Sequence, residues 1–204
     1  MSATIAVLDY GMGNIHSVSR ALQQVGADVV VTTDGSVAAR GDAVLIPGVG
    51  HFGACVRALR TAGLEETVRS AIAAGKPVIG VCVGMQILFE GSDEDDEPGL
   101  GVLPGRVRRL PPGVRVPHMG WNTVAWAGRG HGYTAGIPDN AYFYFVHSFA
   151  PDLGPETVGA TEHGRTFCAV VARDNVFATQ FHPEKSGDVG LRLYANIVGE
   201  AAAA

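Results

Sequence analysis

An apolar run that leads directly into a helical pattern, with a cysteine at the junction, constrains this fold more than any other stretch. The segment from Pro77 to Phe89 contains a β-branched run after Gly75 and Pro77, which suits a strand buried on both faces. Residues Met85 to Glu90 then predict a helix. The chain must therefore turn tightly at Cys82.

The glycines around Cys82 have the spacing of a nucleophile elbow. Gly80 and Gly84 lie two residues on either side of it, and small neighbours let a chain bend sharply while the nucleophile's side chain stays clear of the sheet. A thiol at a helix N-terminus also has its thiolate stabilised by the helix dipole and free N–H groups. An isolated cysteine is more often a buried structural residue. The elbow spacing and the downstream motifs favour a nucleophile instead.

Composition restricts the class of protein. A chain of 204 residues with 47% hydrophobic and 17% charged residues predicts one globular domain over residues 1–204, and a net charge of −5 argues against nucleic acid. The first ten residues include no basic segment, and the apolar runs are too short to span a bilayer, so we expect a cytoplasmic protein. No CxxC pair occurs, so neither a disulfide framework nor a zinc site is expected from Cys55, Cys82 and Cys168.

The N-terminal half alternates strand and helix patterns, which predicts a parallel sheet covered on both faces. The expected strands are Thr4–Leu8, Asp28–Thr32 and Ala43–Ile46, and the expected helices are Ile15–Val25, Ala54–Thr61 and Leu64–Ala74. Functional groups should collect beyond the carboxyl ends of the strands. Asn14, Val49 and Cys82 all follow such ends.

The second half has a different pattern. The acidic segment Ser92–Pro98 reads as a solvated connection, and short strands separated by Gly, Pro and Asn turns follow it, which predicts antiparallel strands added to the parallel half. A helix over Asp188–Val198 closes the chain, and Ala201–Ala204 should fray. The expected strands are Arg106–Leu110, Asn122–Trp126, Tyr142–Val146, Val158–Glu162, Phe167–Ala172 and Val176–Phe181.

Two other kinds of site were considered. The turn Gly11–Asn14 follows a strand, but it lacks the third glycine of a dinucleotide fingerprint and the lysine of a P-loop, so a structural turn is favoured. Four histidines have no metal-ligand spacing and are assigned to surface or satisfied core positions; they are His16, His118, His131 and His163. We expect no metal and no cofactor.

A partner for the cysteine follows the last strand. His182 and Glu184 are two residues apart around Pro183, and in an extended segment such residues face the same side. His182 would then take the thiol proton, and Glu184 would fix its tautomer. On its own, the tripeptide is as consistent with a surface turn.

Together these motifs resemble the class I, triad-type glutamine amidotransferases. Four further segments resemble, in matching order, the family of glutaminase subunits of imidazole glycerol phosphate synthase. The departures are small: Val83 stands where leucine is usual, and Phe149, which lacks a tyrosine's hydroxyl, is left out of the expected binding residues. The four segments are Pro47–Gly53, Pro117–Asn122, Tyr144–Ser148 and His182–Ser186.

The resemblance implies a fold and a reaction. The fold would be an open, mostly parallel α/β sheet with flanking helices and added antiparallel strands. Cys82 would attack the carboxamide of glutamine, giving ammonia and a thioester that water hydrolyses, with His182 and Glu184 completing the triad. The backbone N–H groups of Val49 and Val83 would bind the oxyanion. By analogy, glutamine would be held by Gly50, Gln86, Glu94, Tyr144 and Ser148.

The resemblance also implies a partner, a TIM-barrel cyclase subunit that uses the ammonia in histidine biosynthesis and forms a heterodimer with this chain. Asn14, Met119, Trp121 and Lys185 match interface and gating positions, although core packing explains Trp121 equally well. A glutaminase that feeds pyridoxal phosphate synthesis is a rival, disfavoured by the Pro117–Asn122 segment. A catalytically silent interaction module is the other, disfavoured by the intact triad.

Overall fold

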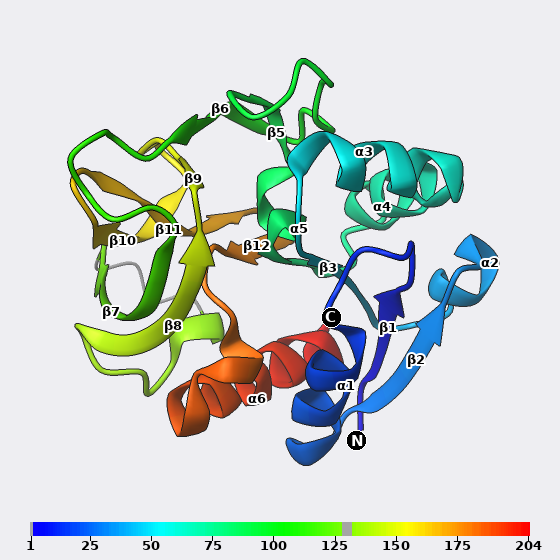
Figure 1. The fold of residues 1–204 in the computed structure, drawn as a ribbon. Helices are drawn as coiled ribbons and strands as arrows, with labels where there is room; N and C mark the ends of the chain where they lie inside the picture. Colours follow the sequence, from blue (N-terminus) through cyan, green and yellow to red (C-terminus); the bar gives the residue numbers. More distant parts are fainter. Residues whose placement is uncertain (1, 128–131) are drawn as a thin grey trace.

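The computed structural model describes residues 2–127 and 132–204, and within them a nine-stranded sheet forms the centre of the fold (Figure 1). Five strands run parallel and are followed by four antiparallel ones, in the order β2-β1-β3-β4-β12-β11-β10-β7-β8. This confirms the predicted α/β class with antiparallel strands added in the C-terminal half, except that the strand expected at Val176–Phe181 was wrongly counted among them, since β12 runs parallel to β4. The strands are β1 (Thr4–Leu8), β2 (Asp28–Thr32), β3 (Ala43–Gly48), β4 (Val78–Cys82), β7 (His118–Trp126), β8 (Ala141–His147), β10 (Thr157–Glu162), β11 (Thr166–Arg173) and β12 (Val176–Thr179).

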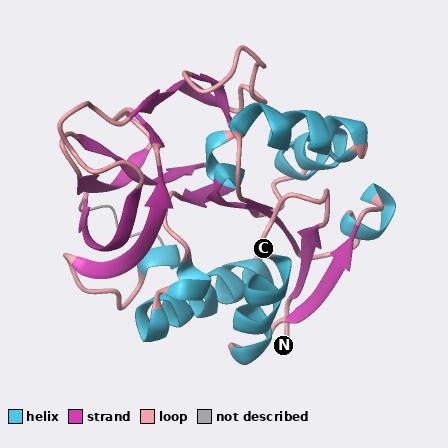
Figure 2. Ribbon diagram, in the orientation of Figure 1, coloured by secondary structure: helices cyan, strands magenta, loops and turns pink. Residues whose placement is uncertain are grey.

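Helices cover both faces of the parallel part of the sheet (Figure 2). On one face α1 (Ile15–Gln24) packs against α6 (Gly187–Ala203), and on the other α3 (Phe52–Thr61) packs against α4 (Leu64–Ala73). The remaining helical segments are short: α2 (Gly35–Ala38), α5 (Val83–Gln86), η1 (Gly132–Thr134) and η2 (Pro183–Lys185). The predicted fraying of Ala201–Ala204 is wrong for its first three residues, because α6 continues to Ala203.

A second, three-stranded sheet corrects two sequence predictions. It contains β5 (Phe89–Ser92), β6 (Leu103–Arg109) and β9 (Phe149–Pro151), so the expected strand near Arg106 lies outside the main sheet. The predicted helix over Met85–Glu90 is wrong. The amides of residues 99–103 donate to the carbonyls of residues 87–90, so these carbonyls pair with a distant segment and the helix ends after one turn.

The acidic segment is less solvated than predicted. Arg57 Nη1 of α3 lies 3.4 Å from an oxygen of Asp95, and Arg60 pairs with Glu97. Ser92, at its start, is buried. These ion pairs hold the segment against α3, beside the end of β3.

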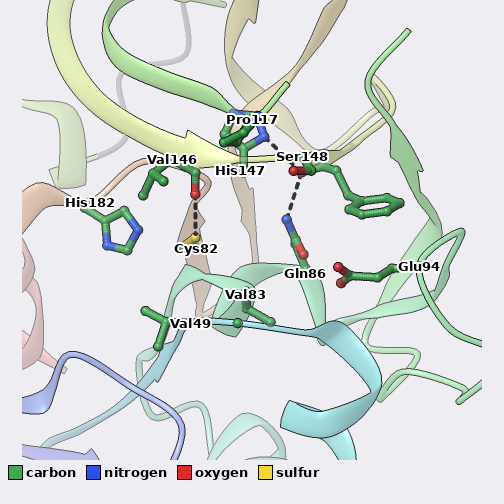
Figure 3. A pocket seen from close by; sticks show the side chains of 12 residues that line it. Val49, Cys82, Val83, Gln86, Glu94, Pro117, Val146, His147, Ser148 and His182 are labelled. Carbon is green, nitrogen blue, oxygen red and sulfur yellow. Dashed lines mark hydrogen bonds between the residues drawn. The ribbon is translucent and has the colours of Figure 1, made fainter. Parts of the chain in front are cut away.

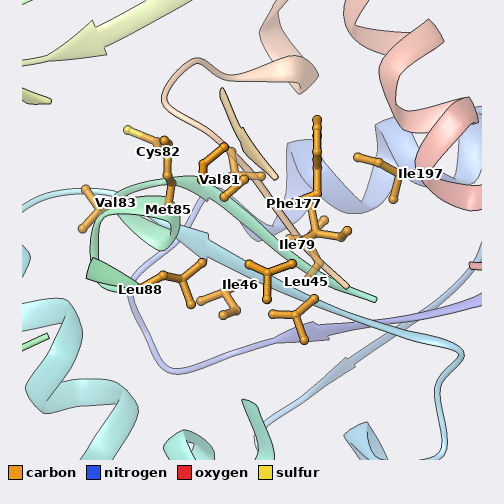
Figure 4. Packing of buried hydrophobic residues seen from close by; sticks show 14 of the residues in the cluster. Leu45, Ile46, Ile79, Val81, Cys82, Val83, Met85, Leu88, Phe177 and Ile197 are labelled. Atoms are coloured by element: carbon orange, nitrogen blue, oxygen red, sulfur yellow. The ribbon is translucent and has the colours of Figure 1, made fainter. Parts of the chain in front are cut away.

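The hydrophobic core lies where β3, β4 and β12 meet (Figure 4). Leu45, Ile79 and Phe177 come from these three strands, and Ile197 of α6 packs beside them, each with no more than 1% of its surface exposed. Burial of such side chains contributes about 1.5–3 kcal/mol each, which fixes the neighbouring strands firmly.

The register of the three core strands brings their carboxyl ends together. Gly48 of β3 pairs with Cys82 of β4, and Val81 pairs with Thr179 of β12. The residues that follow these positions, beginning with Val49, Val83 and Gln180, therefore emerge at one edge. This edge is where functional groups of a parallel sheet gather.

Replacement of Gly84 by alanine tests the close contact at this edge. A Cβ at Gly84 would collide with the Ile46 carbonyl oxygen, and backbone there cannot move aside, so we expect Gly84→Ala to lose about 2 kcal/mol or more of unfolding free energy. A Cβ at Gly199 of α6 would meet open space, so Gly199→Ala should gain about 0.5–1 kcal/mol. Urea unfolding measures both. Equal stability of wild type and Gly84→Ala would contradict the packing at the elbow.

Candidate active site

Cys82 lies at a sharp bend between β4 and α5. Its φ of 55° and ψ of −111° are rarely adopted by a residue with a side chain, and only 3% of its surface is exposed. The sharp turn predicted from Gly80 and Gly84 is therefore present. Because α5 has only four residues, the helix-dipole argument does not apply, and Cys82 is the N-cap residue of a single helical turn.

The thiol of Cys82 faces a cavity of about 270 Å³ (Figure 3). Val49 and His182 lie on one side of the sulfur, and Gln86 and Glu94 lie on the other. The chain segments that follow β3, β4, β8 and β12 all contribute to it. Its lining consists of Val49, Gly50, Cys82, Val83, Gln86, Glu94, Pro117, Val146, His147, Ser148, Phe149 and His182.

His182 and Glu184 form a buried pair. Nδ1 of His182 lies 2.8 Å from Oε1 of Glu184, and their side chains are 2% and 0% exposed. The predicted pairing is present, but its geometric reason was wrong, since Pro183–Lys185 form a 3₁₀ turn rather than an extended segment. The Tyr194 hydroxyl donates to the other Glu184 oxygen at 3.5 Å, and the His182 amide donates to the Tyr144 carbonyl at 2.9 Å.

The charge state of His182 follows from its neighbours. Burial alone would lower its pKa, but the negative charges of the Cys82 thiolate and the Glu184 carboxylate outweigh burial and raise the pKa to about 10. Within the described residues, its Nε2 atom has no hydrogen-bond partner, and the ring lies beside the sulfur. The site therefore favours a protonated imidazolium at His182, beside the Cys82 sulfur.

The two other cysteines are expected to be unreactive. Burial raises the pKa of Cys55 and of Cys168 to about 12, so both remain protonated thiols near neutral pH. The Cys55 thiol donates to the Val49 carbonyl at 3.4 Å and so contacts the loop that borders the cavity.

Gln180 belongs to the site although sequence analysis did not select it. Its Nε2 lies 3.7 Å from the Cys82 sulfur, and its Oε1 accepts from Gln86 Nε2 at 2.9 Å. Gln86 Nε2 also donates to the Phe149 carbonyl at 2.9 Å, so both of its hydrogens are used and its oxygen remains to accept from a ligand. The signal in the sequence was an amide placed two residues before His182.

Most of the other predicted pocket residues reach the cavity. Val49, Gly50, Val83 and Ser148 line it, and Gly50 has a φ of 91° that a side chain would disfavour. Glu94 also lines it, with one oxygen accepting from the Phe52 amide at 2.8 Å.

Tyr144 lies outside the cavity lining, beside predicted partner residues. Its ring contacts Trp121 edge-on at 6.2 Å, and Lys185 Nζ lies 5.8 Å from its centre. Trp121 and Met119 are 56% and 58% exposed, which excludes core packing as the role of Trp121. Asn14 stands at the start of α1 without a side-chain capping bond.

The structure offers no metal site in the residues it describes, where no group of three or more His, Cys, Asp or Glu side chains gathers. His118 is buried and paired with His147, as a satisfied core histidine would be. His131 lies outside the described residues. No helix in the described ranges is long and apolar enough to cross a membrane.

Comparison with protein families defines the class of protein. The family model for glutamine amidotransferase class-I matches residues 6–198, which is nearly the whole chain. Solved structures with the same fold include PurLQS from Thermotoga maritima, with a TM-score of 0.76, 20% identity, and coverage of 98% of this chain and 99% of that one. A crystal structure of a glutamine amidotransferase matches with a TM-score of 0.71, 24% identity, and coverage of 96% and 98%.

Comparison with curated relatives identifies the family within this class of protein. Imidazole glycerol phosphate synthase subunit HisH from Synechococcus sp. (strain JA-3-3Ab) is 45% identical, with coverage of 95% of this chain and 92% of the relative. The subunit of the same name from Synechocystis sp. (strain ATCC 27184 / PCC 6803 / Kazusa) is 46% identical, with coverage of 97% of both chains. The chain therefore belongs to the HisH family of class-I glutamine amidotransferases.

Acid should weaken the fold through His118 and His147. Burial lowers the pKa of His118 to about 4, and the nearby imidazole of His163 adds to this effect. Burial lowers the pKa of His147 to about 3, and His118, His163 and His182 add to the effect there. The unfolded chain takes up these protons near pH 6.5, so protons favour unfolding below that pH, and stability falls by about 2 kcal/mol for each histidine between pH 7 and pH 5. In urea unfolding, the advantage of wild type over His147→Leu should shrink by about 2 kcal/mol over this interval. An advantage independent of pH would contradict the buried neutral state.

Proposed function

We propose that this chain hydrolyses glutamine to glutamate and ammonia. The observation that carries the proposal is that Cys82 and His182 line one cavity and that Glu184 holds the histidine, with 2.8 Å between Nδ1 of His182 and Oε1 of Glu184. Membership of the glutamine amidotransferase family supports it. A thiolate beside an imidazolium supplies both the nucleophile and the acid that amide cleavage requires.

In the first half of the reaction, the Cys82 sulfur forms a bond to the side-chain carbonyl carbon of glutamine. The negative charge on the carbonyl oxygen is stabilised by the backbone N–H groups of Val49 and Val83. His182 then donates its proton to the departing nitrogen, which leaves as ammonia and produces a glutamyl thioester. In the second half, His182 takes a proton from water, whose oxygen attacks the thioester and releases glutamate.

The cavity contains groups suited to the amino-acid end of glutamine. The free oxygen of the Gln86 amide accepts a hydrogen bond, and the Glu94 carboxylate attracts the α-ammonium group. Ser148 and Gly50 border the same cavity. Tyr144 is best suited to the partner surface, given its contacts with Trp121 and Lys185.

The ammonia passes to a cyclase subunit with a TIM-barrel fold, which makes imidazole glycerol phosphate and an aminoimidazole carboxamide ribonucleotide in histidine biosynthesis. The relatives' names, which describe subunits of imidazole glycerol phosphate synthase, support this pairing. Direct transfer shelters ammonia from protonation in water. The exposed side chains of Met119, Trp121 and Tyr142 supply an apolar docking surface, to which Asn14 and Lys185 add polar groups.

The test separates the source of ammonia from its use. Cys82→Ala and His182→Ala, each in complex with the cyclase subunit, should reduce glutamine-dependent synthesis by at least about a thousandfold, because the nucleophile or its acid is lost. Synthesis from ammonium salts should stay close to wild type. Product formation from each nitrogen source is measured in the same assay.

Cys168→Ala is the matched control, since this thiol is buried away from the cavity, and it should retain glutamine-dependent synthesis. Full glutamine-dependent synthesis by Cys82→Ala would refute the assignment. Loss of the ammonium-dependent reaction in a folded Cys82→Ala complex would refute the division of labour between the subunits.

A further inference from the structure

Two buried histidines face one another at the cavity, and one of them, His147, lines it. His118 of β7 and His147 of β8 are directly paired in the sheet register and are 5% and 6% exposed. Nδ1 of His118 lies 2.9 Å from Nε2 of His147, and Nδ1 of His147 lies 2.9 Å from the Phe149 carbonyl oxygen. The triad does not use either of them, so their role requires a separate account.

Hydrogen bonds run in a line from the Phe149 carbonyl through His147 and His118 to Asn122. The groups at the two ends of this line determine which atom donates in each bond. The Phe149 carbonyl oxygen only accepts, so Nδ1 of His147 carries the proton, and Nε2 of the neutral ring accepts from His118 Nδ1. His118 Nε2 then accepts from Asn122 Nδ2 at 3.2 Å, an amide whose oxygen already accepts from the Thr123 N–H. Both rings are therefore Nδ1–H tautomers, the form that free histidine populates less.

The surroundings keep both rings neutral. Burial lowers the pKa of His147 to about 3 and that of His118 to about 4. The imidazole of His163 stacks on His118 at 4.2 Å, and the charge of His182 disfavours a second charge on His147. Protonation of either ring would put a donor where the line requires an acceptor.

The line continues from the histidines to the nucleophile. The Phe149 carbonyl accepts from both His147 and Gln86. Gln86 donates in turn to Gln180, whose amide nitrogen lies 3.7 Å from the Cys82 sulfur. The orientation of the Phe149 peptide therefore determines which way the Gln86 amide faces, and through it which atom of Gln180 faces the sulfur.

We propose that His147, supported by His118, is a positioning residue that holds the Phe149 carbonyl and thereby presents the Gln86 oxygen to glutamine and the Gln180 amide nitrogen to Cys82. The proposal rests on the glutaminase function. Without His147, the Phe149 peptide loses one of two partners and the Gln86 amide can turn over. Glutamine binding should then weaken more than chemistry at the sulfur slows.

Nitrogen NMR of the full chain tests the tautomers without reference to activity. With ¹⁵N-labelled histidine at pH 7, His118 and His147 should each show a protonated Nδ1 and an unprotonated Nε2. Assignment uses His118→Gln and His147→Asn. A protonated Nε2 on either ring, or a ring protonated at both nitrogens, would overturn the proposed line of hydrogen bonds.

Steady-state glutaminase kinetics with the cyclase subunit tests the positioning. His147→Leu should raise KM for glutamine about tenfold, which is the loss of about one buried hydrogen bond, with a smaller fall in kcat. His147→Asn, which keeps an amide N–H near the position of Nδ1, should recover most of that loss. Phe145→Leu is the matched control: it removes a buried ring that stacks on His118, and it should lower Tm but leave KM within about twofold.

The outcomes separate this proposal from the proposed function. An inactive wild-type complex would refute the function, while the NMR result would still decide the tautomers. An active wild type with an unchanged KM in His147→Leu, or a His147→Asn as impaired as His147→Leu, would overturn the positioning role. If His147→Leu does not fold, two other measurements decide the positioning role. These are the KM of His147→Asn compared with that of Phe145→Leu, and the histidine tautomers of wild type.

Discussion

The site depends on one backbone bend, in which Cys82 is held at a positive φ between the end of β4 and a single helical turn. Such a conformation costs about 1–3 kcal/mol in a residue with a side chain. The elbow accommodates it because Gly84 lies directly against the Ile46 carbonyl and Gly48 against the Gly84 amide, so β3 approaches the turn more closely than any side chain would allow. Burial of β4 on both faces offsets the cost.

The charge of His182 follows from where the bend places Cys82. A histidine buried as deeply as His182 would ordinarily be neutral, as His147 is, and the two differ in what faces them. His182 lies between the Glu184 carboxylate and the Cys82 sulfur, whereas His147 lies between a carbonyl oxygen and another imidazole. One fold thus places a charged and a neutral histidine around the same cavity. The first transfers protons, and the second positions the Phe149 carbonyl.

Sequence analysis correctly predicted the features that depend on residues close together in the chain. The elbow spacing located the bend at Cys82, and apolar runs bounded by turn residues located most strands, because both depend on neighbouring residues. The helix over Met85–Glu90 was wrong because distant amides of residues 99–103 bind its carbonyls, which no local pattern reveals. Gln180 and His147 were missed for a related reason: a single polar residue at or just after the end of an apolar strand gains its role only from partners that are distant in the sequence.

Alternation along β8 places Tyr144 on the face that carries Trp121. In β8 the side chains of Phe143, Phe145 and His147 are buried, so Tyr144 points to the opposite face, toward Trp121. The family resemblance assigned Tyr144 to glutamine, whereas its contacts with Trp121 and Lys185 favour the partner surface. His182 and Glu184 show the converse case, since their pairing was predicted from an extended segment and is achieved by a 3₁₀ turn.

The most direct test of this account is a search for the covalent intermediate. The complex with the cyclase subunit and its ligand is supplied with isotopically labelled glutamine, quenched in acid during turnover, and mapped by peptide mass spectrometry. The account predicts a labelled glutamyl group on the Cys82 peptide that hydroxylamine removes and that is absent from Cys82→Ala. Ammonia release accompanied by a glutamyl group on any other residue would contradict it.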